Sequence, residues 1–195
     1  MLKVGITGGI GSGKTIVCQV FETLGIPVFN ADNAAKYLME HDAPLVEKIK
    51  SLFGEEVYIG KELQREKLAA IIFADEKKRN LLNEIVHPAT IAYGEKWMKT
   101  QTTPYALKEA ALLFESGSHK GLDKIIGVYA PVELRIQRAL QRDKATREKI
   151  EARIASQMNE EEKMKRCDFV ILNDGGTAII PQVLHIHRVL SQKII

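Results

Sequence analysis

The chain of 195 residues lacks the features of a membrane protein and of a disulfide-rich secreted protein. Its longest apolar runs fall far short of the ~20 residues that span a bilayer. The N-terminus carries one lysine and a short apolar run broken by glycines, without a small-residue cleavage site, which does not match a signal peptide. Cys18 and Cys167 form no C-x-x-C pair. We therefore expect reduced thiols in a cytoplasmic protein, with no zinc site and no membrane association.

The chain also has little excess charge, with a formal net charge of +3. That excess does not by itself indicate a nucleic-acid partner, and we expect none. The basic residues are concentrated between Arg135 and Arg166, where they could bind a polyanionic small molecule. No feature of the sequence implies an obligate protein partner.

The sequence lacks several motifs that are typical of GTPases and of motor or transporter ATPases. The chain contains neither the D-x-x-G nor the N-K-x-D of GTPase switch proteins. It also lacks the strongly apolar strand ending in Asp-Glu that is usual in nucleic-acid motors and transporter ATPases. These absences leave a small-molecule kinase as the favoured class for any phosphate-binding loop in the chain.

Such a loop is present at residues 8–15, which read GGIGSGKT and fit the pattern G-x-x-x-x-G-K-[ST]. Glycines let successive N–H groups point inward and form an anion cradle, to which the following helix adds its positive end. We expect Lys14 to reach the β- and γ-phosphates of ATP and the Thr15 hydroxyl to ligate Mg²⁺. A glycine-rich turn without a ligand is the alternative. The predicted nucleotide-binding residues are Gly9, Gly11, Ser12, Gly13, Lys14, Thr15 and Ile16.

Hydrophobic periodicity predicts an α/β fold. A strand at 2–7, the loop, a helix that ends near Gly25 and a strand at 26–29 begin a parallel sheet. Further strands are expected at 105–111, 124–130 and 168–172, and a final helix at 177–191. The fold class is thus a P-loop kinase-type parallel sheet flanked by helices.

Between these strands the pattern becomes helical. Helices are expected at 65–73, 76–86 and 88–100, with Asp75 as an N-cap and Pro88 in a first turn. Residues 57–63 form a small hairpin or a loop. We predict a nucleotide-binding core at 1–33, 101–136 and 167–195, a helical acceptor domain at 34–100, and a helical lid at 137–166.

Asp32 is the candidate general base, because it follows the second strand on the side where open parallel sheets bind ligands. The alternative is that Asn30 or Asp32 only caps the next helix. Arg138 and Arg142 share one helical face with Arg135 and are candidates for gripping the transferred phosphoryl group. A solvated helix face is the alternative.

Other polar residues carry weaker signals. His87 precedes Pro88 and is more often structural than a ligand when taken alone. His185 and His187 are expected on the surface of the last helix, and Glu160–Glu162 at the solvated start of a helix that Asn159 caps. Two hypotheses from the residues alone remain at this point: a kinase for a small alcohol or nucleoside, and a nucleotide-dependent switch or regulatory binder without turnover.

An ordered set of later motifs makes the sequence resemble the dephospho-CoA kinase family along nearly its whole length. The matching segments are TGGIGSGKT, Ala31-Asp32, Leu63-Gln64-Arg65, Leu82-Asn83, His87-Pro88, Leu112-Leu113-Phe114-Glu115, Arg138-x-x-x-Arg142-Asp143, Arg153-Ile154-Ala155-x-Gln157 and Asp168-Phe169-Val170-Ile171-x-Asn173-Asp174-Gly175.

The resemblance implies ATP-dependent phosphorylation of the ribose 3′-hydroxyl of dephospho-CoA, the last step of coenzyme A synthesis, with Mg²⁺ as cofactor. It implies that Asp32 is the base, that Arg65 and His87 serve the acceptor, and that Arg138 and Arg142 belong to the lid. It also implies that Asn173 lies near the adenine.

Two positions depart from the family pattern. The family commonly has Asp-x-Asp where this chain has Asn30-Ala31-Asp32, so the base is kept and the first carboxylate is lost. The family's Asp and Pro before Leu-Leu-Phe-Glu are replaced by Glu109 and Ala111. We therefore assign Glu115 to the acceptor site. The longer Glu109 is a weaker candidate for a partner of Mg²⁺.

Overall fold

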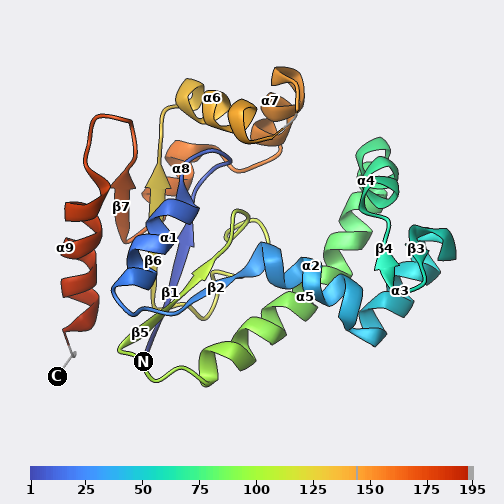
Figure 1. Ribbon diagram of the computed structural model, residues 1–195, viewed down its shortest axis with the longest axis horizontal. Helices are drawn as coiled ribbons and strands as arrows, with labels where there is room; N and C mark the ends of the chain where they lie inside the picture. The colour runs from blue at the N-terminus through green and yellow to red at the C-terminus, as the bar shows by residue number, and fades with distance from the viewer. Residues whose placement is uncertain (144, 193–195) are drawn as a thin grey trace. The chain divides into compact units, whose positions relative to one another are not determined.

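The computed structural model describes residues 1–143 and 145–192 (Figure 1). It divides into two compact units, one formed by Met1–Asn30 with Met98–Ile195 and the other by Ala31–Trp97. We call them the sheet unit and the helical unit. Residue 144 of the predicted lid and residues 193–195 of the predicted core lie outside the described residues.

A five-stranded parallel sheet forms the centre of the sheet unit, in the order β2-β5-β1-β6-β7. Its strands are β1 (Leu2–Thr7), β2 (Val28–Asn30), β5 (Tyr105–Glu109), β6 (Lys124–Tyr129) and β7 (Phe169–Leu172). All five residues of β5 are buried, as expected where helices or loops cover both faces of a parallel sheet. The predicted α/β class is confirmed, although β5 ends two residues before the expected boundary at 111.

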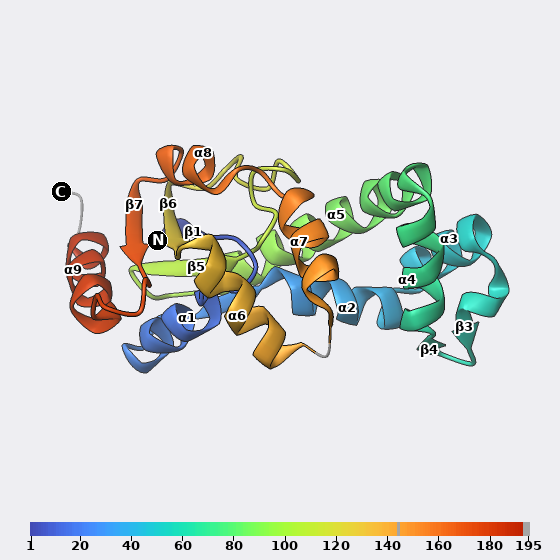
Figure 2. The same ribbon diagram turned by 90° about the horizontal axis from the view of Figure 1, so that it is seen from above.

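Helices cover the two faces of this sheet. The helices of the sheet unit are α1 (Lys14–Thr23), α6 (Val132–Arg142), α7 (Arg147–Ala155), α8 (Glu160–Lys165) and α9 (Ile179–Ser191). Phe21 of α1 and Val183 of α9 share one apolar core with Ile6 and Ile126. The neighbouring Gly127 points to the opposite face, where a Cβ would meet Met164 of α8. Figure 2 shows α1 and α8 on opposite sides of the sheet.

The helical unit has its own apolar core. Its elements are α2 (Ala31–His41), α3 (Ala43–Phe53), the 3₁₀ turn η1 (Glu55–Val57), β3 (Tyr58–Ile59), β4 (Glu62–Leu63), α4 (Arg65–Ala74) and most of α5 (Glu76–Lys99). Ile49, Val57 and Leu68 lie within this core. The antiparallel pairing of β3 with β4 confirms the small hairpin.

Residues 76–99 form one helix, so the prediction of separate helices at 76–86 and 88–100 was wrong. Pro88 lies inside α5 rather than in a first turn. A proline removes one backbone donor and crowds the preceding turn, which often ends a helix. Leu82 and Val86 of the same helix are buried in the core of the helical unit, and this packing outweighs the cost of the proline. Asp75 accepts hydrogen bonds from the amides of Lys77 and Lys78, as predicted for an N-cap.

Candidate active site

The glycine-rich loop joins the carboxyl end of β1 to the first turn of α1. Gly13 is the N-cap of α1 with φ of 92°, a left-handed conformation that side chains disfavour. A Cβ there would also strike Nδ2 of Asn173, which donates to the carbonyl of Ser12 over 2.8 Å. Within the described residues no side chain caps α1, and the N-terminus of such a helix favours an anion.

Lys14 bends back over the loop that precedes it. Its Nζ donates to the carbonyl oxygens of Gly8 at 2.8 Å and Gly9 at 3.2 Å. The hydroxyl of Ser12 is buried and has no hydrogen-bond partner within the described residues. A buried donor without a partner is costly, and a bound phosphate oxygen would satisfy it.

Oxygen atoms gather beside the start of α1. The Thr15 hydroxyl lies 3.4 Å from Oε1 of Glu109, at the carboxyl end of β5. Asn30, the last residue of β2, donates from Nδ2 to Oε2 of the same carboxylate over 2.6 Å. An aspartate at position 30 would place a second negative charge against Glu109. The Asn30 amide instead donates a hydrogen bond to the Glu109 carboxylate. Glu109 thus lies beside Thr15, the residue that the loop pattern predicts as a magnesium ligand.

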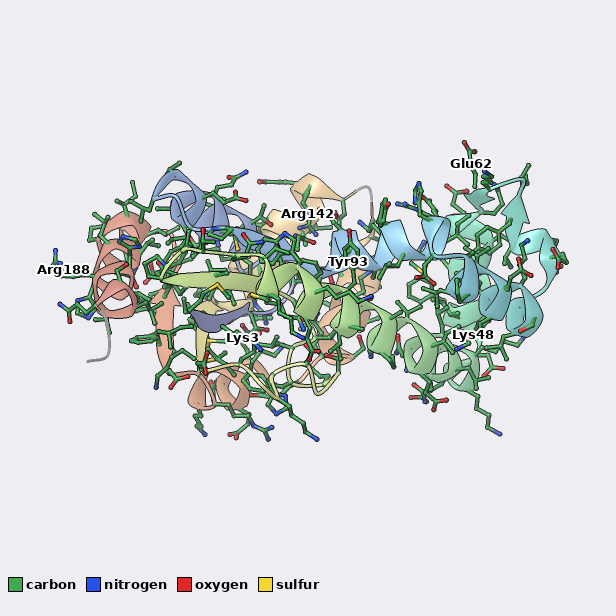
Figure 3. The ribbon with its side chains drawn as sticks, turned by 90° about the horizontal axis from the view of Figure 1, so that it is seen from below. Lys3, Lys48, Glu62, Tyr93, Arg142 and Arg188 are labelled. Atoms are coloured by element: carbon green, nitrogen blue, oxygen red, sulfur yellow. The ribbon has the colours of Figure 1, made fainter. Side chains whose placement is uncertain are left out.

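Asn173 follows β7 and connects the loop to α6. Beyond its bond to Ser12, it accepts from Arg138, whose NH1 lies 3.0 Å from the Asn173 carbonyl and whose NH2 lies 3.2 Å from Oδ1. Arg142 behaves differently: its guanidinium pairs with Asp143 at 2.9 Å and is 63% exposed (Figure 3). The two arginines share a helix, and within the described residues Arg138 is the one joined to the glycine-rich loop, through Asn173.

Glu115 connects the segment after β5 to α8. It accepts from the amide of Met158 at 2.9 Å and pairs with the buried ammonium of Lys163 at 3.1 Å. Partial burial alone would raise the pKa of Glu115, but the Met158 amide and Lys163 outweigh it and hold that pKa below its usual range.

This carboxylate should make stability depend on pH. Because its pKa is lower in the folded chain, the ion pair stabilises the fold above the unfolded pKa, near 4.5, and this contribution is lost as pH falls through the folded value. We expect Glu115→Gln to lower the thermal midpoint at pH 7 and to show a shallower loss than the parent below pH ~4.5. Thermal melts between pH 3 and 7 test this, with Glu162→Gln as an exposed control. Parallel curves for parent and Glu115→Gln would contradict it.

Three predicted residues belong to the helical unit. Asp32 is exposed in the first turn of α2, two residues after β2 ends. Arg65 begins α4 and pairs with Glu40 at 2.9 Å. His87 lies inside α5, where burial lowers its pKa and favours the neutral imidazole at neutral pH. Their roles toward an acceptor stay predictions.

Sequence reasoning missed part of the loop's surroundings. The glutamates at 160–162 were expected to be solvated, but the Glu160 side chain is only 10% exposed and pairs with buried Arg135. The signal available was the row of basic residues on α6, which implied a nearby acid.

A histidine of the last helix also differs from its prediction. His187 was expected on the surface, yet its Nδ1 lies 2.8 Å from the Tyr105 hydroxyl. The remaining loop residues agree with the P-loop pattern, and Ile16 is 55% exposed beside it.

Comparison with known proteins identifies the family. The family model described as dephospho-CoA kinase matches residues 2–178. The chain belongs to the dephospho-CoA kinase family. It is 41% identical over 194 residues to the dephospho-CoA kinase of Bacteroides fragilis, covering 99% of this chain and 95% of that protein. The chain is thus a kinase, a phosphotransferase of the final step of coenzyme A synthesis.

Solved structures agree with membership in the dephospho-CoA kinase family. The crystal structure of TT1252 from Thermus thermophilus is 34% identical, with a TM-score of 0.85 and 96% coverage of both chains. Dephospho-CoA kinase from Campylobacter jejuni is 29% identical, with a TM-score of 0.72, and the match covers 99% of this chain and 98% of that one. Across the described residues, no helix is long and apolar enough to cross a membrane.

Proposed function

We propose that this chain transfers the γ-phosphoryl group of ATP directly to the ribose 3′-hydroxyl of dephospho-CoA, giving coenzyme A and ADP. The observation that carries the proposal is the glycine-rich loop at the carboxyl end of β1, with Lys14 bent over it and an uncapped helix behind it, in a chain of this family. Loops of this geometry bind nucleotide phosphates. Positioning and electrostatic stabilisation then supply most of the rate, so no covalent enzyme intermediate is needed.

On the donor side, the loop amides bind the β-phosphate. The Lys14 ammonium has three donors, so it bonds to the β- and γ-phosphates while it keeps a hydrogen bond to a loop carbonyl. Thr15 and Glu109 supply oxygen ligands of the kind that Mg²⁺ prefers, and a metal that keeps several waters needs few protein ligands. Bound there, Mg²⁺ would neutralise charge on the phosphates. Asn173 fixes the carbonyl of Ser12 and so the shape of the cradle beside the adenosine.

On the acceptor side, Asp32 orients the 3′-hydroxyl and takes its proton. Its position after β2, at the ligand-binding edge of a parallel sheet, supports this role. Residues 34–100 hold the acceptor, with Arg65 available for its phosphates, and His87 and Glu115 as further contacts. Residues 137–166 act as the lid that excludes water from the transferring group.

Arg138 is the lid arginine that the contacts favour, because its bonds to Asn173 hold it beside the loop. We expect Arg138→Ala to lower kcat by about 10²- to 10³-fold, as for one lost charge-stabilising donor, while the Kd for ATP changes little. Steady-state kinetics and ATP titration measure the two effects. Arg147→Ala is the control, because the partners of Arg147 among the described residues are exposed glutamates on α6 and α7. Equal losses in kcat and ATP affinity would make Arg138 an ordinary binding residue.

We place the enzyme in the cytoplasm. The two cysteines support a reducing compartment, because both are free thiols and burial raises the pKa of each, which makes them poorly reactive.

An acceptor panel tests the proposed function. ADP release is coupled to a spectroscopic readout with dephospho-CoA, a nucleoside or shikimate as acceptor, and with ATP alone. We expect strong stimulation by dephospho-CoA only. Stimulation by a nucleoside without stimulation by dephospho-CoA would overturn the assignment.

A further inference from the structure

Two peptide groups of the loop are held from both sides. The peptide between Gly8 and Gly9 accepts Lys14 Nζ on its carbonyl and donates its N–H to Oε1 of Glu160 at 3.0 Å. The next peptide, between Gly9 and Ile10, also accepts Lys14 and donates to Oε1 of Gln157 at 3.2 Å. Lys14 therefore contacts the oxygen side of both planar groups, and the segment after α7 contacts the nitrogen side.

Glu160 is in turn fixed by a buried cation. Its Oε2 lies 3.1 Å from NH1 of Arg135, whose side chain is 4% exposed. The packing is close: a Cβ at Gly9 would overlap both the Arg135 guanidinium and the Glu160 carboxylate. Residue 9 must therefore lack a side chain for this arrangement to form. We call Arg135, Gln157 and Glu160 the latch.

We propose that the latch is a positioning device for Lys14. Because a peptide group is planar, an acceptor on its N–H fixes the direction of its carbonyl, and hydrogen bonds in a chain polarise one another. The Glu160 carboxylate thus orients the Gly8 carbonyl and strengthens its bond to the Lys14 ammonium. Gln157 does the same, without charge, for the Gly9 carbonyl.

The latch also connects the lid range to the nucleotide loop. Gln157 and Glu160 lie within residues 137–166, and the loop begins after β1, so the contacts span 147 and 151 residues of chain. A cavity of about 480 Å³ borders the latch, lined by Tyr129, Val132, Arg135, Ile154 and Gln157 among others. This space gives the segment room to move while the loop accommodates nucleotide. The inference rests on the proposed kinase function, but it concerns the donor side only.

A double variant separates positioning from stability. A buried ion pair can often be replaced by apolar residues without loss of stability, whereas removing one partner leaves an unpaired charge. We expect Arg135→Leu with Glu160→Leu to keep a thermal midpoint near that of the parent, yet to lower kcat by roughly 10-fold, the effect of one lost charged hydrogen bond on a barrier. The KM for the acceptor should stay unchanged.

A single variant gives a second measurement if the double variant does not fold. Gln157→Ala removes the acceptor of the Ile10 amide and should lose several-fold in kcat with an unchanged thermal midpoint. Glu161→Ala is the matched control for the double variant, since it also removes an acid from the first turn of α8 but its side chain is exposed.

The outcomes separate this inference from the proposed function. Parent-like kcat in the folded double variant, or in Gln157→Ala, would overturn the latch. If the parent itself phosphorylates a different alcohol, the proposed function fails, and the same comparison is made with that acceptor. Reduced kcat in the latch variants with either acceptor supports the latch, because Lys14 serves ATP in both reactions.

Discussion

Replacing Asp32 by Asn is expected to lower kcat by at least ~10²-fold, the lower end of the contribution of a general base. The amide keeps the size and hydrogen-bonding reach of the carboxylate but cannot accept the hydroxyl proton. The Kd for ATP should change little, because Asp32 belongs to the helical unit and the loop proposed to bind the donor belongs to the sheet unit. Rapid-quench measurement of a single turnover isolates the chemical step from product release.

Glu47→Gln is the matched control for this experiment. It makes the same carboxylate-to-amide change at an exposed position of α3 in the same unit, and we expect parent-like rates. Near-parent turnover in Asp32→Asn would remove Asp32 from the role of base and leave it as a residue of the first turn of α2. A large rise in the Kd for ATP would likewise contradict the division between donor and acceptor residues.

Lys14→Met carries the second large expected effect. We expect kcat to fall by about 10²–10³-fold, as when a preorganised charge donor is removed, and the Kd for ATP to rise as well. The methionine retains the length and flexibility of the side chain but lacks the ammonium that bonds to Gly8 and Gly9 and is proposed to bond to the phosphates as well. Single-turnover rates and fluorescent-nucleotide titrations measure the two quantities.

Two further variants sharpen the Lys14 test. Lys48→Met makes the same change at an exposed position of the helical unit, and we expect no effect (Figure 3). Lys14→Arg keeps the charge but replaces a compact ammonium by a planar fork, so it should stay well below the parent. Full activity in Lys14→Met would contradict the proposed donor site.

The parallel sheet was predictable because its signals are local. Short apolar strands alternate with amphipathic helices, and this alternation reports on neighbouring residues only. The boundary errors have the same origin. Pro88 is a local stop signal, and the packing of Leu82 and Val86 that overrides it involves contacts with distant parts of the chain.

The candidate site likewise has one part that the local sequence predicts and another part that depends on contacts between distant residues. The loop is a continuous motif and its glycine-rich pattern was readable, while the structure adds that a Cβ at Gly13 would meet Asn173. Glu160 was not readable, because its partners Gly9 and Arg135 are 151 and 25 residues away in the chain. An acid at the start of a helix has the same local pattern whether it is solvated or buried in an ion pair.

The arginines of α6 show where periodicity stops being informative. Spacing places Arg135, Arg138 and Arg142 on one face, yet the structure gives them different surroundings. Arg135 is buried against Glu160, Arg138 is bonded to Asn173, and Arg142 pairs with the neighbouring Asp143. Their partners distinguish them: Glu160 begins α8 and Asn173 follows β7, and neither residue is adjacent to α6 in the sequence.

The central claim is direct transfer of the γ-phosphoryl group of ATP to one hydroxyl of dephospho-CoA. Its most direct test is incubation of the enzyme with dephospho-CoA and ATP labelled in the γ-phosphate, followed by ³¹P NMR of the purified product. We predict that the label appears as a phosphomonoester on the ribose 3′-oxygen, with one ADP formed per product. Label found only in free phosphate, or on another hydroxyl, would contradict the account.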